Sequence, residues 1–170
     1  MASFDEAVKI VCEKHNLKEL NKYQREALDQ FVLKRRDVFV NLPTGSGKSM
    51  IYLALPLLFD SMYDTSGHIV VVVSPLISLM KDQVSSLERL GISAVSLSDI
   101  KDEEIKDIEK GKFSVVYGTP EAWLKCERWR KLLSSSIYNS KLCGIAVDEA
   151  HVIKQWLVIF IKSLQSLSVY

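Results

Sequence analysis

Short apolar runs alternate with amphipathic segments along most of the chain. The runs that predict strands are residues 38–40, 69–73, 94–97, 115–117 and 145–147. The run at 69–73 is one isoleucine followed by four valines, and such β-branched runs are typical of strands covered on both faces in a parallel sheet. Because predicted helices separate these strands, the pattern favours an α/β fold with a doubly wound, largely parallel sheet.

The segments between these runs have apolar residues at helical spacing. We expect helices at residues 3–15, 22–34, from 50 onward, 76–90, 102–110 and 121–133. Ser3 and Glu6 have the spacing of a capping box at the first helix, and Gly91 is placed to stop the helix at 76–90. Pro56 should kink or end the helix that begins near residue 50, because proline has no backbone N–H to donate.

A glycine-bearing loop, Asn41–Ser49, lies between a predicted strand and a predicted helix. This context is typical of a phosphate-binding loop, whose backbone N–H groups form an anion-binding concavity at a helix N-terminus. The candidate nucleotide-binding residues are Thr44, Gly45, Ser46, Gly47, Lys48 and Ser49. Lys48 would reach the terminal phosphates and Ser49 would ligate Mg²⁺. The strict pattern requires glycine where this chain has Leu42, so the loop alone is also compatible with an ordinary flexible turn.

Polar turns follow three other predicted strands, at Ser74-Pro75, Thr119-Pro120 and Asp148-Glu149. Ligands bind at the carboxyl ends of parallel strands, so we expect these turns and the phosphate loop to form one site. Asp148 could hold Mg²⁺ through water, opposite Ser49, and Glu149 could orient the attacking water. An acidic pair at a strand end can also simply cap a turn. Together the two halves favour a nucleotide hydrolase with Lys48, Asp148 and Glu149 as its catalytic residues.

Two side chains leave alternatives open. Gln24 lies near the start of the second predicted helix, and its amide could both donate to and accept from the edge of an adenine. A solvated helix glutamine is the plainer interpretation of the same residue. His151 could couple the nucleotide state to a nucleic-acid site, or it could pack beneath the sheet.

Composition narrows the protein class without naming a partner. The 170 residues fit one domain of ordinary globular composition, 48% hydrophobic and 25% charged. A net charge of +1 argues neither for nor against a nucleic acid. Three cysteines without close spacing suggest a reducing compartment and no zinc site. The N-terminus lacks the features of a secretory signal, and the apolar stretch at 157–170 is shorter than the about twenty residues a membrane-spanning helix needs.

The motifs taken together resemble the first RecA-like domain of superfamily 2 helicases, specifically the RecQ family. The resemblance covers roughly residues 10–156. The matching segments are Tyr23–Leu28, Leu42–Ser49, Val73–Gln83, Tyr117–Glu121 and Asp148–His151. The segment Ser74–Gln83, with the sequence SPLISLMKDQ, is the most RecQ-like of these.

The resemblance implies a role for each candidate residue. Gln24 would read adenine, Lys48 and Ser49 would bind phosphate and Mg²⁺, Asp148 would hold the metal, and Glu149 would activate water. The nucleic-acid-binding residues would be Ser74, Pro75, Leu76, Thr119, Pro120 and Glu121. It further implies ATP and Mg²⁺ as cofactors, single-stranded or partially duplex DNA as partner, 3′–5′ translocation, and work in DNA repair or recombination. The expected location is the nucleus in a eukaryote and otherwise the cytoplasm, with no membrane association.

The chain departs from the family pattern at two places. Asn21 stands where the family usually carries arginine, and residues 157–170 diverge from it altogether. We therefore expect residues 1–156 to form one RecA-like domain that includes helices 3–34, followed by a divergent apolar tail at 157–170, with the second RecA-like domain missing. Because that second domain supplies the arginine finger, we expect this chain to turn ATP over very slowly alone. A non-catalytic module that binds ATP and nucleic acid is the main alternative, and an RNA helicase is a more distant one.

Overall fold

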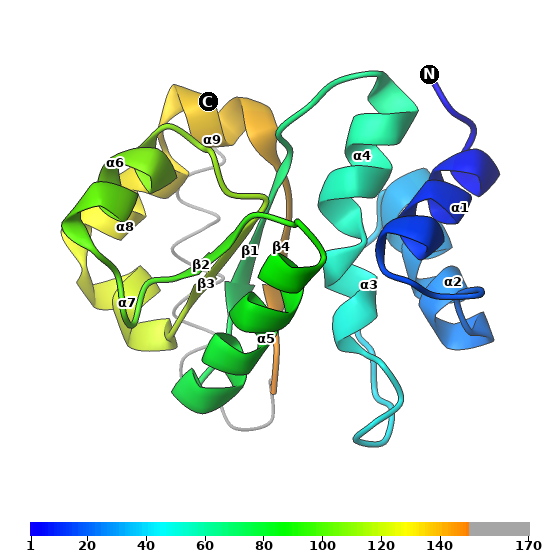
Figure 1. The fold of residues 1–170 in the computed structure, drawn as a ribbon, viewed down its shortest axis with the longest axis horizontal. Coiled ribbons are helices and arrows are strands. Elements are labelled where there is room, and N and C mark those ends of the chain that lie inside the picture. Colours follow the sequence, from blue (N-terminus) through cyan, green and yellow to red (C-terminus); the bar gives the residue numbers. More distant parts are fainter. Residues whose placement is uncertain (150–170) are drawn as a thin grey trace. The chain divides into compact units, whose positions relative to one another are not determined.

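The computed structural model describes residues 1–149, which fall into two compact units. The first unit comprises residues 1–68 and the second begins at Ile69. In Figure 1 the first unit runs from blue to green-cyan and contains helices only, whereas the second contains the sheet. Each unit is described by itself.

The first unit consists of short helices. They are α1 (Phe4–Lys14), α2 (Lys22–Leu28), η1 (Asp29–Leu33), α3 (Ser49–Leu53) and α4 (Leu55–Tyr63). The predicted capping box is confirmed at α1, where the Glu6 N–H donates to the Ser3 hydroxyl and the Ser3 N–H donates to the Glu6 carboxylate. The Ser3 hydroxyl also donates to the Glu6 carboxylate, and the two bonds from Ser3 to that carboxylate, the backbone N–H first, hold the pKa of Glu6 below its usual range. The apolar face of α1 packs on α4.

Two of the predicted helices are interrupted, one unexpectedly and one as predicted. The helix predicted at residues 22–34 forms, but Asp29–Leu33 are a π-helix, η1, in which the Lys34 N–H donates to the Asp29 carbonyl at 3.2 Å. The helix after the phosphate loop breaks at Ala54, and Pro56 lies in the first turn of α4, where no N–H is required of it. The expected effect of Pro56 is thus confirmed.

The strand predicted at residues 38–40 is wrong. These residues have no regular secondary structure and are not among the four strands of the sheet in the described residues. Phe39 is 84% exposed. A short apolar run becomes a strand only when another strand pairs with it, so composition alone overestimates strands of this length.

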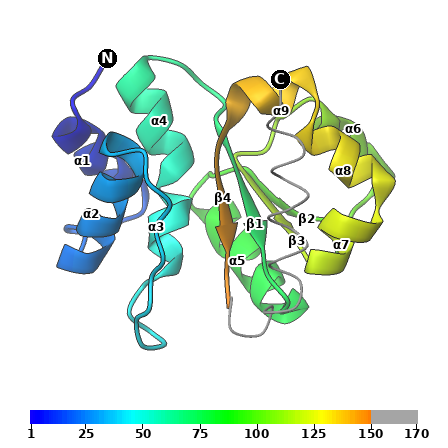
Figure 2. The same ribbon diagram turned by 180° about the vertical axis from the view of Figure 1, so that it is seen from behind.

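Over residues 69–149, the second unit contains a four-stranded sheet with helices on both faces (Figures 1 and 2). Its elements are β1 (Ile69–Val73), α5 (Ile77–Arg89), β2 (Ala94–Ser96), α6 (Asp102–Glu109), β3 (Val115–Gly118), α7 (Pro120–Lys125), α8 (Glu127–Leu133), α9 (Ser136–Lys141) and β4 (Leu142–Val147). The strand order is β2-β3-β1-β4 and every pairing is parallel. The predicted parallel α/β fold is confirmed.

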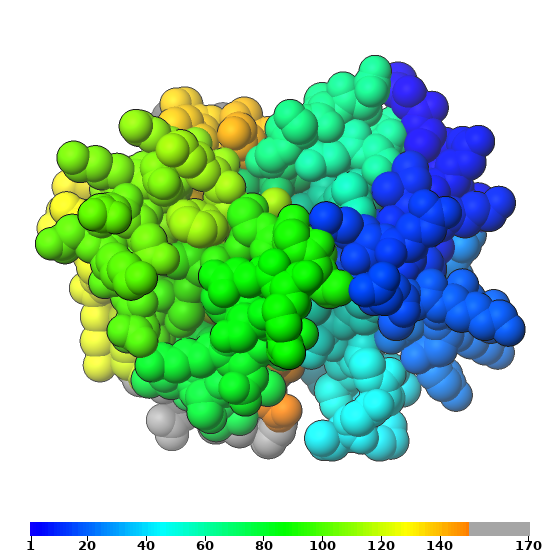
Figure 3. Space-filling view, in the orientation of Figure 1, coloured from blue at the N-terminus to red at the C-terminus, as the bar shows by residue number. Residues whose placement is uncertain are grey.

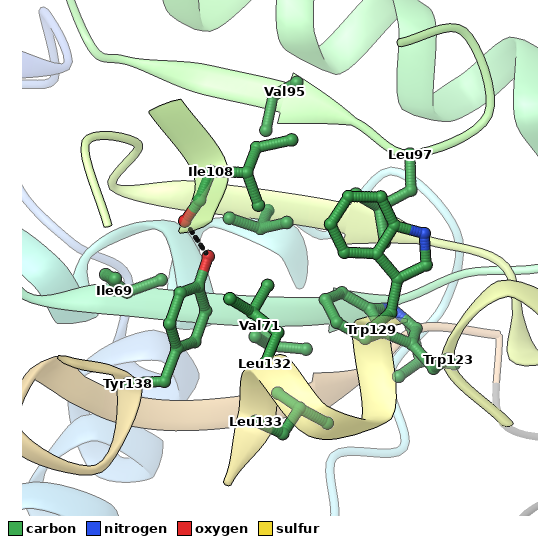
Figure 4. Close-up of a cluster of buried hydrophobic side chains, with 12 residues drawn as sticks. Ile69, Val71, Val95, Leu97, Ile108, Trp123, Trp129, Leu132, Leu133 and Tyr138 are labelled. Carbon is green, nitrogen blue, oxygen red and sulfur yellow. Dashed lines mark hydrogen bonds between the residues drawn. The ribbon is translucent and has the colours of Figure 1, made fainter. Parts of the chain in front are cut away.

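The core of this unit lies between the sheet and helices α6 to α9. All five residues of β1 are buried, as expected for a strand covered on both faces. Figure 4 shows the cluster on one face, in which Trp123, Trp129 and Tyr138 from three helices surround Val71. On the other face α5 contacts β2, and the Tyr117 hydroxyl donates to the Gln83 side chain at 2.6 Å. None of the helices in the described residues is both long and apolar enough to cross a membrane.

The helix predicted at 121–133 is two helices, α7 and α8. Cys126 between them has an extended backbone, which interrupts the helical hydrogen bonds. The short helix α9 has no clear signal in the sequence, because only two of its six residues, Ile137 and Tyr138, are large and apolar. Tyr138 is fully buried in the core of this unit, so tertiary contacts rather than a local sequence pattern account for α9.

Candidate nucleotide and nucleic-acid site

The phosphate loop connects η1 to α3 in the first unit. In the space-filling view its segment, coloured cyan, is visible at the surface (Figure 3). Lys48 is half-buried and its Nζ donates to the carbonyls of Leu42 and Pro43, at 2.7 and 3.2 Å. The Ser46 hydroxyl donates to the Pro43 carbonyl at 2.7 Å. The loop therefore curls around the lysine ammonium, the group that a phosphate requires there.

The substitution of leucine for glycine at position 42 does not disturb this arrangement. Leu42 contacts Lys48 through its backbone carbonyl, which any residue supplies. Gly45 and Gly47 both have left-handed backbones, with φ of +83° and +76°. A Cβ on Gly47 would lie 2.6 Å from the Gln24 side-chain nitrogen, whereas a Cβ on Gly45 would meet nothing within 4 Å. The left-handed backbone explains why both positions are glycine, and close packing against Gln24 is an additional reason at Gly47.

Gln24 is buried at 7% exposure, so the interpretation of a solvated glutamine is wrong. Its Oε1 accepts the Asn21 N–H at 2.9 Å, and its Nε2 donates to the Gly47 carbonyl at 3.0 Å. A primary amide has two N–H donors and two acceptor positions, so these two bonds leave one of each. The remaining pair is what an adenine edge would use.

Asn21 contributes a contact that the sequence reasoning missed. Its Oδ1 accepts the Gln24 N–H at 2.9 Å, and its Nδ2 donates to the Ser46 carbonyl at 3.2 Å. Asn21 and Gln24 thus form a reciprocal capping box at the start of α2. The spacing of a helix-capping asparagine and a glutamine three residues later could have revealed the box, although not its contact with the loop.

Three of the predicted turns meet at one edge of the sheet in the second unit. Ser74, Thr119 and Asp148 follow β1, β3 and β4, and the register pairs Val73 with both Gly118 and Val147. The Ser74 N–H donates to the Gly118 carbonyl at 3.0 Å, and the Asp148 N–H donates to the Val73 carbonyl at 2.9 Å. The expected convergence is confirmed for these three turns. The fourth predicted member, the phosphate loop, belongs to the first unit.

Within these turns the candidate DNA-contacting residues differ in exposure. Ser74 is 1% exposed, and its hydroxyl has no hydrogen-bond partner in the part of the chain that the structure describes. Pro120 is also buried, whereas Leu76 is 47% exposed and Glu121 is exposed. Thr119 is half-buried and caps α7, because its hydroxyl accepts the Ala122 N–H at 3.2 Å. Leu76, Thr119 and Glu121 are thus the accessible members of the predicted DNA-contacting set, whereas Ser74 and Pro120 are buried.

The acidic pair has a defined local geometry. Asp148 and Glu149 are half-buried, and the Glu149 N–H donates to Asp148 Oδ1 at 3.0 Å. Glu149 has a left-handed backbone with φ of +52°. Among the described residues no three histidine, cysteine or acidic side chains cluster as a metal site. Mg²⁺ needs no such cluster, since it keeps several waters and takes one or two carboxylates together with substrate phosphates. The Asp148 carboxylate and the Ser49 hydroxyl, each taken by itself, offer oxygen atoms of the kind that this ion binds. His151 lies outside the described residues.

Comparison with known proteins matches residues 21–168 to the DEAD/DEAH box helicase family. The chain is 38% identical over 159 residues to the putative ATP-dependent DNA helicase Q1 of Caenorhabditis elegans, covering 89% of this chain and 24% of that protein. It is 35% identical over 155 residues to ATP-dependent DNA helicase Q1 of Rattus norvegicus, covering 84% and 24%. It is 34% identical over 138 residues to ATP-dependent DNA helicase RecQ of Bacillus subtilis, covering 78% and 21%.

The fold also resembles that of a solved helicase. The chain matches the crystal structure of the DUF1998 helicase MrfA bound to DNA and AMPPNP with a TM-score of 0.66 at 22% identity, covering 89% of this chain and 22% of that one. This likeness shows the fold alone. The chain spans about a quarter of the length of the curated relatives named above, and those relatives are RecQ-type helicases. By the extent of the family match, the chain belongs to the DEAD/DEAH box helicase family.

Proposed function

We propose that this chain is the ATP-binding motor domain of a RecQ-type DNA helicase. The observation that carries the proposal is the loop curled around the Lys48 ammonium directly before α3, with two left-handed glycines beside it. Backbone N–H groups, a lysine and a helix N-terminus are together the chemistry that holds a nucleoside triphosphate. The family match and the RecQ-type relatives support ATP as that nucleotide.

Each site residue has a role in this proposal. Lys48 pairs with the terminal phosphates, and Gln24 uses its remaining donor and acceptor on the adenine edge. The Ser49 hydroxyl and the Asp148 carboxylate are the groups that would hold Mg²⁺, which neutralises charge on the phosphates when bound with ATP. Glu149 orients the attacking water, and the Glu149 backbone N–H donates to the Asp148 carboxylate and so holds that carboxylate in place.

The edge of the sheet at Leu76, Thr119 and Glu121 is the proposed contact for a single strand of DNA. Turns of this kind contact the sugar-phosphate backbone without reading bases, which suits a protein that moves along any sequence. For the whole protein we propose ATP-driven 3′–5′ translocation along a single strand, with single-stranded or partially duplex DNA as its partner. We also propose a nuclear location in a eukaryote and a cytoplasmic one otherwise.

Lys48→Ala tests nucleotide binding. We expect the affinity for Mg²⁺-ATP to fall by roughly 10- to 100-fold, because a hydrogen bond to a charged group contributes about 1.5–3 kcal/mol. The circular dichroism spectrum should not change, since Lys48 is half-buried in a surface loop. Lys9→Ala, at an exposed lysine on α1, is the matched control. Unchanged ATP affinity in Lys48→Ala would refute the phosphate-loop assignment.

Phosphate release, measured with and without single-stranded DNA, separates the helicase motor from a non-catalytic module. We expect the chain to bind ATP and to hydrolyse it slowly, with little stimulation by DNA, if a second domain must supply the arginine finger. Robust DNA-stimulated turnover would show that one domain suffices. Binding of both ligands without any turnover would favour the non-catalytic module.

A further inference from the structure

Two amide side chains from the start of α2 hold two consecutive carbonyls of the phosphate loop. Asn21 Nδ2 donates to the Ser46 carbonyl at 3.2 Å, and Gln24 Nε2 donates to the Gly47 carbonyl at 3.0 Å. We propose that Asn21 is a positioning residue, which together with Gln24 aims the N–H groups of Gly47 and Lys48 at a bound phosphate. This inference rests on the proposed binding of ATP.

The direction of the N–H groups follows from peptide geometry. The structure has no cis peptide bonds, and in a planar trans peptide the C=O of one residue points opposite to the N–H of the next. Fixing the carbonyls of Ser46 and Gly47 on the α2 side therefore turns the N–H groups of Gly47 and Lys48 to the other side. Within residues 1–149 these two N–H groups donate no hydrogen bond to the protein. They remain available for phosphate oxygens.

The capping box makes the two amides rigid enough to set this direction. Asn21 Oδ1 accepts the Gln24 N–H and Gln24 Oε1 accepts the Asn21 N–H, both at 2.9 Å. Because each amide is planar, fixing its oxygen also fixes the plane in which its nitrogen donates. Gln24 is 7% exposed and has little access to water as an alternative partner. Gly47 has no Cβ, and this permits the close approach of the Gln24 amide.

Among side chains of this length, only asparagine can both accept the Gln24 N–H and donate to the Ser46 carbonyl. Serine caps a helix about as well as asparagine, because its hydroxyl accepts the same N–H. It has no donor at the position of Nδ2, so Asn21→Ser keeps the cap and removes the bond to the Ser46 carbonyl. Asn21→Ala removes both. The matched control is Ser3→Ala, which removes the equivalent capping box of α1 without touching the phosphate loop.

The experiment measures affinity for Mg²⁺-ATP, affinity for Mg²⁺-tripolyphosphate, and melting temperature in the wild type and these three variants. We expect Asn21→Ser to melt near the wild-type temperature and to bind both ligands about 2- to 10-fold more weakly, as expected for one neutral hydrogen bond. The factor should be equal for the two ligands, because the lost contact acts on the phosphates. Ser3→Ala should melt at a lower temperature with unchanged affinities.

Three outcomes would overturn the inference. Wild-type affinity in Asn21→Ser is the first, and an affinity loss for ATP alone, which would make Asn21 a base-contacting residue, is the second. The third is a loss in Ser3→Ala as large as in Asn21→Ala, which would reduce the effect to helix stability. Failure of the proposed function would look different. In that case Lys48→Ala would bind ATP as tightly as the wild type does, or the wild type would bind neither ligand. The inference about Asn21 would then fall together with the proposed function.

Discussion

At the scale of single residues, the phosphate loop depends on contacts that reach it from outside its own segment. Lys48 donates to carbonyls within the loop, whereas Asn21 and Gln24 donate to two other loop carbonyls from the start of α2. The two loop glycines are consequently not equivalent. Gly47 lies against the buried Gln24 amide, and Gly45 has open space around it.

Gly47→Ala and Gly45→Ala separate backbone strain from packing. Both variants require alanine in the left-handed region, which costs roughly 1–2 kcal/mol. Only Gly47→Ala also displaces the Gln24 amide, whose buried hydrogen bond costs about 1–3 kcal/mol to lose. We expect Gly47→Ala to bind Mg²⁺-ATP at least about fivefold more weakly than Gly45→Ala, as measured by titration. Equal affinities in the two variants would show that Gln24 moves aside without consequence.

At the scale of elements, a buried polar contact joins two helices of the second unit. The Tyr138 hydroxyl donates to the Ile108 carbonyl at 3.1 Å and so connects α9 to the end of α6 (Figure 4). The Ile108 carbonyl also accepts the Gly111 N–H, so it keeps a partner when the hydroxyl is removed. Burial raises the pKa of Tyr138 well above that of an exposed tyrosine.

This contact predicts a pH dependence of stability at the alkaline end. Below about pH 9, Tyr138→Phe should lower the free energy of unfolding by about 1 kcal/mol, because one hydrogen bond is lost. Above about pH 10 the phenol ionises in the unfolded chain but stays neutral in the folded one, so the contribution of Tyr138 falls as pH rises.

Denaturant unfolding of both proteins at pH 7 to 11 tests this expectation. The difference between wild type and Tyr138→Phe should be constant up to about pH 9 and shrink beyond about pH 10, where an ordinary tyrosine ionises. A difference that grows with pH would contradict the buried neutral phenol.

At the scale of the whole molecule, polar turns from distant parts of the second unit share one sheet edge. Ser74, Thr119 and Asp148 are brought together by the parallel register of β1, β3 and β4. With a net charge of +1, the chain as a whole offers little electrostatic attraction to nucleic acid. Any affinity must therefore come from a local surface, and this edge is the surface that we propose.

Single-strand binding should therefore be tolerant of sequence and sensitive to salt. We expect labelled oligo-dT and oligo-dA of equal length to bind with similar affinity, since backbone contacts do not read bases. Titrations at two salt concentrations should show weaker binding at the higher one, with log K falling by about 0.7 per phosphate contact for each tenfold rise in salt. Strong preference for one base, or indifference to salt, would contradict the assignment of these turns.

The parallel α/β fold, the strand at 69–73 and the capping box of α1 were predictable because each depends on local composition or spacing. The candidate phosphate-loop residues and the acidic pair could be named for the same reason: their chemistry lies in residue type and order. Tertiary structure alone decided that residues 38–40 form no strand, since pairing is not encoded within three residues. It also decided that Gln24 is buried and that Asn21 reaches the Ser46 carbonyl, because hydrogen bonds across 25 residues depend on how helix and loop pack.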